Sequence, residues 1–241
     1  AAQCGVSVIL YEMRPQKMTG AHRTGDVAEL VCSNSLRSRE LCTGAGLLKE
    51  ELRRASSLIM EAAYASAVPA GSAMAVDREL FSRFIDQRLA GHPNITIVRE
   101  EVEKLPDTGV IIIASGPLTS GALAEEIRRF IGGEHLYFYD AIAPIVDAES
   151  IDFSIAFRAS RYGKGDDDYI NCPMNEVEYD RFYNALVEAD TIDAHAFEQA
   201  LFFEGCMPIE VMARRGKKTL CFGPMKPVGL IDPRSGSRPY A

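Results

Sequence analysis

The feature that most restricts the fold is a short apolar run near the start of the sequence. Residues 6–11 (VSVILY) are rich in β-branched and aromatic side chains, and the acidic residue Glu12 follows directly. A run of this kind is typical of a strand that is covered on both faces in a parallel sheet. We therefore expect a fully buried parallel strand with Glu12 at its carboxyl end.

Further strands and helices alternate along the first half of the chain. Residues 94–102 (NITIVREEV) and 109–116 (GVIIIASG) read as two more strands, and the spacing of apolar residues predicts helices around them. Such alternation favours an α/β domain with a parallel sheet. The helices are expected at 46–65, at 78–90 between the cap Asp77 and Gly91, and at 121–133 after Thr119 or Ser120.

The pattern of apolar residues changes in the second half of the chain, where the short apolar segments suggest strands of an antiparallel or mixed sheet. We place a boundary between residues 118 and 119, which gives a partial Rossmann-like domain at 1–118 and a mixed α+β insertion domain at 119–241. The elements expected in the second domain are strands at 136–146, 154–160 and 168–174, a helix at 176–190 capped by Asn175, and a helix at 194–203.

Composition excludes several classes of protein. The 241 residues carry a net charge of −8, which argues against a surface generally coated with nucleic acid. The 6 cysteines form no CxxC pair, so we expect reduced thiols and no metal site. No apolar run is long enough to span a membrane and no leader is visible, so a cytoplasmic protein is expected. Both ends read as cut, and we expect a fragment of a longer protein.

Cys206 stands in the stretch 204–218 (EGCMPIEVMARRGKK), ahead of a short predicted helix. A nucleophilic cysteine needs a lowered thiol pKa, which a helix N-terminus or nearby cations provide, and Pro208 suits a first helical turn. A buried structural thiol is the alternative. The cations at the far end suit either the helix C-terminus or a bound phosphate; they are Arg214, Arg215, Lys217 and Lys218.

Other candidate residues lie in loops. Glu12 can accept a hydrogen bond from a ribose hydroxyl, as an acid after the second strand does in dinucleotide-binding folds, although acids after strands are common. Gly116 permits close approach of the backbone to a cofactor, or forms a plain turn. Two further candidates lie in the long irregular segment 13–44. Cys32 is expected either to line the edge of a flavin or to pack as a core thiol. His22 is expected either to stack on a bound ring or to lie at the surface.

At this point the sequence resembles a known family. The blocks LYEMRP, AELVCSNSLRS, HPNITIVREEV, SRYGKG, DYINCPM, FFEGCMPIEVMARRGKKT and FGPMKPVGL, spread over nearly the whole chain, are similar to the folate- and FAD-dependent tRNA (uracil-5-)-methyltransferases of bacteria, the TrmFO or Gid type. The resemblance implies transfer of a methylene group from methylenetetrahydrofolate to C5 of a uridine in the tRNA T loop. FAD mediates the transfer and the reduction to methyl, and NADH or NADPH re-reduces the flavin.

The resemblance also implies site residues. Cys206 is expected to attack uracil C6, and Cys32 is expected to stand at the flavin face. The resemblance implies that the family's Gly-rich FAD-binding segment would precede residue 1 and that its C-terminal flavin-closing segment would follow residue 241. Ser115 stands where the family more often has Thr. The implied cofactor-binding residues are Glu12, Arg14, His22, Ser33, Asn34, Val102, Ser115 and Gly116, and the implied RNA-binding residues are the four cations at 214–218.

Two alternatives stay open. One is a GidA-like protein, which also uses FAD and folate but modifies wobble uridines of the anticodon. The other is a non-catalytic fragment with an RNA-binding role, whose cysteines belong to the core. The sequence does not indicate the oligomeric state.

Overall fold

The computed structural model describes residues 1–31, 33–132, 146–164, 166–191 and 207–241. The chain forms two compact units. The first comprises Ala1–Ser35, Leu48–Ala67 and Val76–Ala143, and the second comprises Leu36–Leu47, Val68–Ala75 and Pro144–Ala241. The boundary expected at 118/119 stays a prediction.

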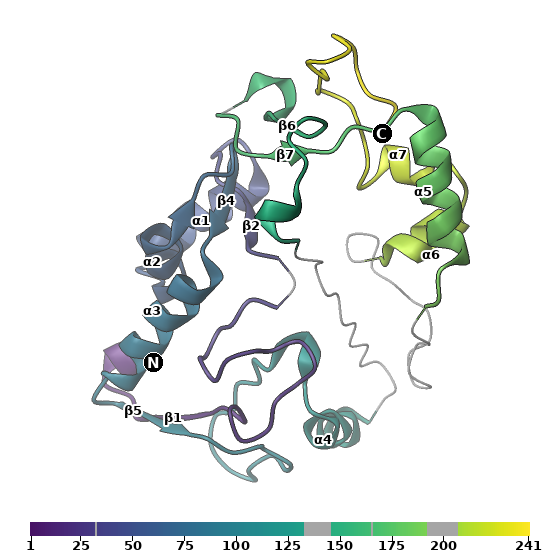
Figure 1. Ribbon diagram of the computed structural model, residues 1–241. Coiled ribbons are helices and arrows are strands. Elements are labelled where there is room, and N and C mark those ends of the chain that lie inside the picture. Colours follow the sequence, from purple (N-terminus) through teal and green to yellow (C-terminus); the bar gives the residue numbers. More distant parts are fainter. Residues whose placement is uncertain (32, 133–145, 165, 192–206) are drawn as a thin grey trace. The chain divides into compact units, whose positions relative to one another are not determined.

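The first unit contains the predicted parallel strand pair. A short 3-10 helix, η1 (Ala2–Cys4), leads into β1 (Val8–Tyr11), which pairs in parallel with β5 (Ile95–Val98) (Figure 1). The expectation of full burial was wrong, because Ile9 is 61% and Tyr11 44% exposed. In the part of the chain that the structure describes, β5 is the sole strand paired with β1, and one face of β1 stays open.

Two helices supply most of the core of the first unit. Helix α2 (Leu58–Ala65) packs against α3 (Arg78–Ala90), and the buried residues between them include alanines, which let the helices approach closely. Asp77 caps α3 as predicted, since its side chain accepts from the Leu80 N–H at 2.9 Å. The fully buried side chains of these helices include Met60, Ala62, Ala63, Phe81 and Ile85.

The continuous helix expected at 46–65 is instead two helices. Helix α1 (Gly44–Arg54) ends before Ser56, which adopts a left-handed backbone with φ +56°. The Ser57 N–H bonds back to the Leu52 carbonyl at 3.0 Å, and Ser57 then stands in extended conformation before α2. The two serines therefore end one helix and begin the next, a signal that apolar spacing alone does not contain.

The strand expected at 109–116 is also absent. Residues 109–115 are irregular, and Val110 and Ile112 are 97% and 85% exposed. An isolated β-rich run forms a strand only when a neighbour pairs with its backbone, and no described strand does so here. A 3-10 turn, η2 (Gly116–Leu118), then precedes α4 (Gly121–Ile131), which Ser120 caps as predicted.

The second unit contains short strands. Strands β6 (Phe157–Arg158) and β7 (Ile170–Asn171) pair in antiparallel fashion, within the two runs predicted there. A three-stranded sheet has the order β2-β4-β3, formed by β2 (Ser35–Ser38), β4 (Ala73–Val76) and β3 (Ala67–Val68). The turns η3 (Ala148–Ser150) and η4 (Arg161–Gly163) flank β6.

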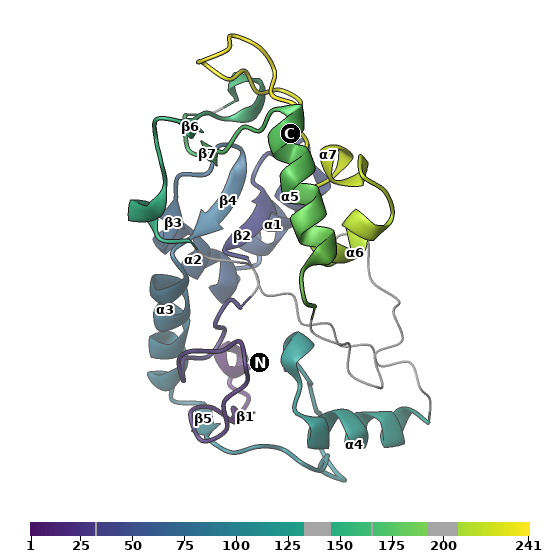
Figure 2. The same cartoon turned by 45° about the vertical axis from the view of Figure 1, so that its right-hand side comes forward.

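A helical cluster completes the second unit. Helix α5 (Glu176–Glu188) lies beside α6 (Ile209–Arg214) and α7 (Thr219–Phe222), as Figure 2 shows. Tyr179, Ala213 and Leu220 are completely buried among them. Burial raises the pKa of the Tyr179 hydroxyl, which donates to the Lys217 carbonyl and so fixes the loop between α6 and α7.

Two predicted elements cannot be compared with the structure. The strand predicted at 136–146 falls, apart from Val146, outside the described residues, and the helix predicted at 194–203 falls wholly outside them. The mixed α/β character of the chain is confirmed by the parallel and antiparallel strand pairs and the helices around them.

The cap of α5 offers a test of the local structure. The Asn175 side chain accepts from the Glu178 N–H at 2.9 Å, and Glu178 accepts from the Asn175 N–H at 2.8 Å. We expect Asn175→Ala to lower the free energy of unfolding in urea by about 1 kcal/mol, because one helix-end donor loses its partner. Asn175→Asp should keep the stability, and equal stability of the Ala variant would contradict the role of the cap.

Candidate functional site

The candidate site lies at the carboxyl edge of the parallel strand pair in the first unit. The Glu12 N–H donates to the Val98 carbonyl at 3.0 Å, so the pairing of β1 with β5 continues to the end of both strands. Loops 12–29 and 99–102 leave the sheet at this same edge. In open α/β sheets, ligands bind outside the carboxyl ends of the strands.

A buried arginine organises the first of these loops. Arg14 is only 4% exposed, and its guanidinium donates two hydrogen bonds of 2.9 Å to Glu12, from Nε to Oε1 and from Nη2 to Oε2. The Nη1 group donates to Glu29 Oε2 at 2.9 Å. Two carboxylates from distant points of the loop therefore meet on one cation, which satisfies the buried charge.

Glu29 closes the loop from the other side. It accepts from the backbone N–H groups of Arg23 and Thr24 at 2.9 and 3.1 Å, and from the Thr24 hydroxyl at 3.0 Å. Burial acts to raise the pKa of Glu29, but these hydrogen bonds and the nearby charge of His22 outweigh it and lower the pKa. Glu29 is thus held as a carboxylate, and it fixes the backbone of 23–24.

A second arginine joins the two loops. Arg99 directly follows β5, and its Nη1 group donates to the carbonyls of Arg14 and Gly25, the former at 3.1 Å. Its Nη2 group pairs with Asp86 of α3 at 3.1 Å. The segment from Arg14 to Gly25 is therefore held by its backbone as well as by its side chains.

Glu12 keeps some capacity to bind a ligand. Burial acts to raise the pKa of Glu12, yet the hydrogen bonds from Arg14 and the charges of Arg14 and Arg99 lower it, so the group is ionised at neutral pH. Oε1 accepts from both the N–H and Nε of Arg14, whereas Oε2 accepts from Nη2 alone among the described residues. A carboxylate oxygen has two lone pairs, so Oε2 can accept one hydroxyl more.

The other predicted residues of loop 13–44 have structural partners. His22 Nδ1 lies 2.6 Å from the Thr19 hydroxyl, and the charge of His22 acts on Glu29. The Asn34 amide donates to the Val76 carbonyl at 3.0 Å, and the Ser33 hydroxyl accepts from the Ser35 N–H at 3.0 Å. The structure thus joins Glu12 and Arg14 in one network and places the charge of His22 near Glu29, while Ser33 and Asn34 anchor a separate part of the chain.

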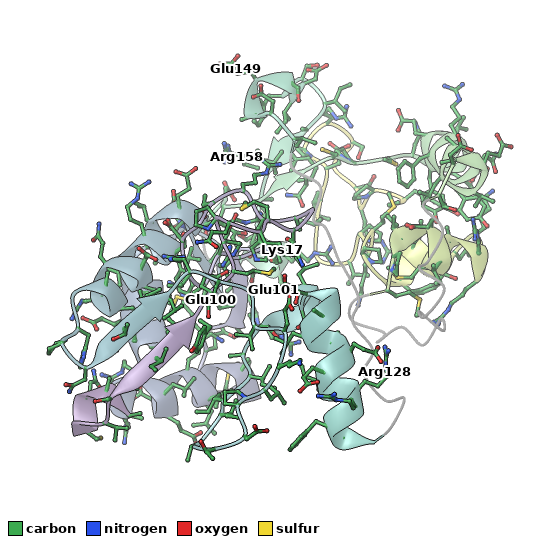
Figure 3. All side chains as sticks on the ribbon, turned by 90° about the horizontal axis from the view of Figure 1, so that it is seen from below. Lys17, Glu100, Glu101, Arg128, Glu149 and Arg158 are labelled. Carbon is green, nitrogen blue, oxygen red and sulfur yellow. The ribbon has the colours of Figure 1, made fainter. Side chains whose placement is uncertain are left out.

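The predicted residues beyond β5 form two further groups. The Ser115 hydroxyl lies 2.6 Å from that of Thr119, which donates to the Gly116 carbonyl at 2.8 Å, so this turn is closed on itself. Gly116 has φ +71°, and an added Cβ would meet nothing within 4 Å, which leaves open space beside the backbone. Val102 is half-buried, next to Glu101, which pairs with Lys17 at 2.7 Å (Figure 3).

The cations predicted to contact RNA lie in the second unit. All of them are exposed, and Arg214 is in the last turn of α6 as predicted. Lys217 Nζ lies 2.6 Å from Asp180 Oδ1 of α5, and this contact raises the pKa of Lys217. Lys217 is therefore engaged with an acid in the protein. The four residues are Arg214, Arg215, Lys217 and Lys218.

The two predicted catalytic cysteines, Cys32 and Cys206, lie outside the described residues. Pro208 stands as the N-cap of α6, one residue before the first helical residue, Ile209. The roles of the two thiols stay predictions.

Sequence reasoning missed the residues that hold the site together. Arg99, Asp86 and Glu29 were not singled out; Arg99 falls inside the strand predicted at 94–102, whereas the observed strand β5 ends one residue before it. A charged residue at the carboxyl end of a buried strand was the available signal, and it had been applied only to Glu12.

The fold and the site define a mixed α/β protein with a polar cluster at the carboxyl edge of a parallel strand pair. The chain belongs to the family described as "GIDA: Glucose inhibited division protein A", whose sequence profile matches residues 1–237. No helix among the described residues is long and apolar enough to cross a membrane.

Curated relatives are similar over essentially the whole chain. Proteins named methylenetetrahydrofolate–tRNA-(uracil-5-)-methyltransferase TrmFO from Aquifex aeolicus and Heliobacterium modesticaldum are 60% and 63% identical over 237 residues, which is 98% of this chain and 53% and 54% of theirs. The protein of the same name from Moorella thermoacetica is 60% identical over 241 residues, 55% of its length. The chain spans about half the length of these relatives.

The Arg14 network gives a stability prediction with a defined pH dependence. Arg14→Ala leaves two half-buried carboxylates without their cation, so we expect a loss of about 3 kcal/mol in the free energy of unfolding near neutral pH. The lowered pKa values of Glu12 and Glu29 stabilise the fold above the ordinary carboxyl pKa of about 4.3, and this stabilisation is lost as the pH falls further. The difference in the free energy of unfolding between Arg14→Ala and wild type, measured by urea unfolding, should therefore be smaller at about pH 3 than at neutral pH.

The matched control is Arg83→Ala, whose exposed partner Glu79 lies 3.9 Å away. It should change stability by less than about 0.5 kcal/mol. A loss from Arg14→Ala no larger than that of the control would show that the network does not hold the loop.

Proposed function

We propose that the whole protein is a methylenetetrahydrofolate–tRNA-(uracil-5-)-methyltransferase that forms 5-methyluridine in the tRNA T loop. The observation that carries this proposal is about 60% identity over the entire chain to relatives with that name. The substrates would be tRNA and the folate methylene donor. The reaction would take place in the cytoplasm, where tRNA is modified.

The proposed cofactor is FAD, and the described residues fit one part of it. Glu12 follows a parallel strand, is ionised and retains an acceptor site on Oε2, which suits a ribose hydroxyl. Arg14 and Arg99 orient that carboxylate and the loop beside it. The proposed architecture is a Rossmann-like FAD-binding domain at 1–118 with an insertion domain at 119–241.

The remaining proposed FAD contacts are supported by fewer structural observations than Glu12. Gly116 leaves open space beside its backbone, and the charge of His22 acts on Glu29, which shares Arg14 with Glu12. When bound, FAD would supply the hydride that completes the methyl group, with NADH or NADPH as its reductant. The other proposed contact residues are Ser33, Asn34, Val102 and Ser115.

Cys206 is proposed as the nucleophile toward the base. Uracil C5 is a poor nucleophile until a thiolate adds to C6, which places electron density on C5. Cys32 is proposed to stand at the flavin face and to help remove the C5 proton. Among the described residues, α6 begins shortly after Cys206, at Ile209, and is followed by the proposed RNA-binding cations.

The family description favours one second candidate. The matching profile carries the GidA name, and a GidA-like protein would modify a wobble uridine with the same cofactors. The position of the modified uridine distinguishes the two activities. A protein restored to the full length of its relatives that binds RNA without transferring a methyl group would instead support the non-catalytic role.

Trapping of a covalent RNA adduct tests the proposed chemistry. A T-arm hairpin with 5-fluorouridine at the target position is mixed with the protein, FAD and methylenetetrahydrofolate, and the products are resolved by denaturing gel and mass. Fluorine cannot leave C5 as a proton does, so we expect a stable adduct from wild type and from Cys42→Ala, but none from Cys206→Ala. An adduct that persists in the Cys206 variant would exclude this thiol as the nucleophile.

Salt dependence of RNA binding tests the cationic residues. We expect Lys218→Ala to weaken binding of the T-arm hairpin and to reduce the slope of log K against log salt by about 1. The effect of Lys217→Ala should be smaller, since its ammonium is already paired with Asp180. Arg181→Ala on α5 serves as the control, and unchanged slopes in both lysine variants would place the RNA elsewhere.

A further inference from the structure

A small pocket in the second unit is not used by the site described above. It measures about 210 Å³ and lies beside β7 and the segment that follows α7. Its lining combines apolar groups with two cations and a thiol. The residues that matter for its chemistry are Phe157, Arg161, Asn171, Cys172 and Lys226.

The walls of the pocket are stiff. Pro173, Pro224 and Pro227 line it, and each proline fixes its own backbone φ angle. The Asn171 amide donates to the Ala159 carbonyl at 3.0 Å, which ties β7 to the residue after β6 behind the pocket. A ligand that enters therefore meets walls that need little rearrangement.

The charge of the pocket is unusual for this chain. Arg161 and Lys226 are both exposed, and neither forms an ion pair with a residue that the structure describes. The whole sequence carries a net charge of −8, so two cations without acidic partners on one apolar pocket mark a site for an anion.

The combination selects one kind of ligand. Apolar walls with Phe157 favour a flat ring, and the two cations favour a side group that ends in carboxylates. The volume is below the roughly 300–1,000 Å³ of pockets for drug-sized ligands, so it suits one ring with its side group. An RNA phosphate needs a cationic surface but no apolar hollow.

We propose that this pocket binds an aromatic ring that carries a carboxylate-bearing side group, and that its occupant is the p-aminobenzoylglutamate tail of the folate substrate. The identity of the occupant rests on the function proposed above, whereas the ligand class rests on the pocket alone. Arg161 and Lys226 bind the carboxylates, and Phe157 and the prolines contact the ring. The pocket thereby contributes to affinity for the folate donor and takes no part in the bond-making steps.

Cys172 allows the pocket to be tested without turnover. Its thiol is free and exposed on the pocket wall, whereas the exposed thiols of Cys4 and Cys42 lie outside the pocket. Alkylation by iodoacetamide is followed at each cysteine by peptide mass. Saturating p-aminobenzoylglutamate should slow the reaction of Cys172 several-fold and leave Cys4 and Cys42 unchanged.

Matched probes and variants distinguish the contribution of the ring from that of the carboxylates, and the pocket cations from other cations of the second unit. p-Aminobenzamide keeps the ring without the carboxylates and should protect Cys172 much less. Arg161→Gln and Lys226→Gln should each raise the concentration for half protection about tenfold, by loss of a charged hydrogen bond. The controls Arg181→Gln and Lys164→Gln remove exposed cations of the same unit outside the pocket and should leave protection unchanged.

The outcomes distinguish this proposal from the proposed function. Protection of Cys172 without methyl transfer to RNA by the whole protein would support the pocket and contradict the methyltransferase assignment. Methyl transfer without protection would overturn the pocket and leave the assignment intact. Protection by inorganic phosphate or by the T-arm hairpin equal to that by p-aminobenzoylglutamate would also overturn it, in favour of a phosphate site.

Discussion

The buried guanidinium of Arg14 is the interaction on which the first unit depends. A cation that is 4% exposed is tolerated only when acids compensate it, and Glu12 and Glu29 both do so. Those acids in turn fix the loop at the end of β1, while Arg99 fixes its backbone. The geometry of the candidate ligand edge is therefore set by electrostatics within the loop, and the strand pair only determines where the loop begins.

Local signals in the sequence predicted much of the fold. The caps Asp77, Ser120 and Asn175 all hold the first turns of their helices, because capping depends on residues only two or three positions apart. A strand within 94–102 and the parallel character of the sheet were also anticipated, although the pairing of that strand with β1 was not. Where the expectation depended on distant contacts it was wrong: the run 109–116 finds no strand partner among the described residues, and β1 lacks cover on one face.

The residues of the candidate site likewise fall into those that the sequence predicted and those that it could not predict. Glu12 was identified from its position after a predicted strand and Arg14 through the resemblance, and the structure joins them directly. Their partner Glu29 could not be found by spacing, since the contact closes a loop without regular structure. Lys217 shows the converse, because a run of cations in the sequence does not reveal that Asp180 on another helix already binds one of them. Side-chain pairing across a fold is the information that patterns lack.

The irregular run at 110–113 has a consequence for handling the protein in solution. Four consecutive β-branched residues carry no charge and no proline, and each is at least 43% exposed. Backbone groups of such a segment can pair with the same segment of another molecule, as strands do at an unprotected sheet edge. Self-association of this chain would then rise with concentration and be suppressed by a lysine in that run, without any dedicated subunit interface.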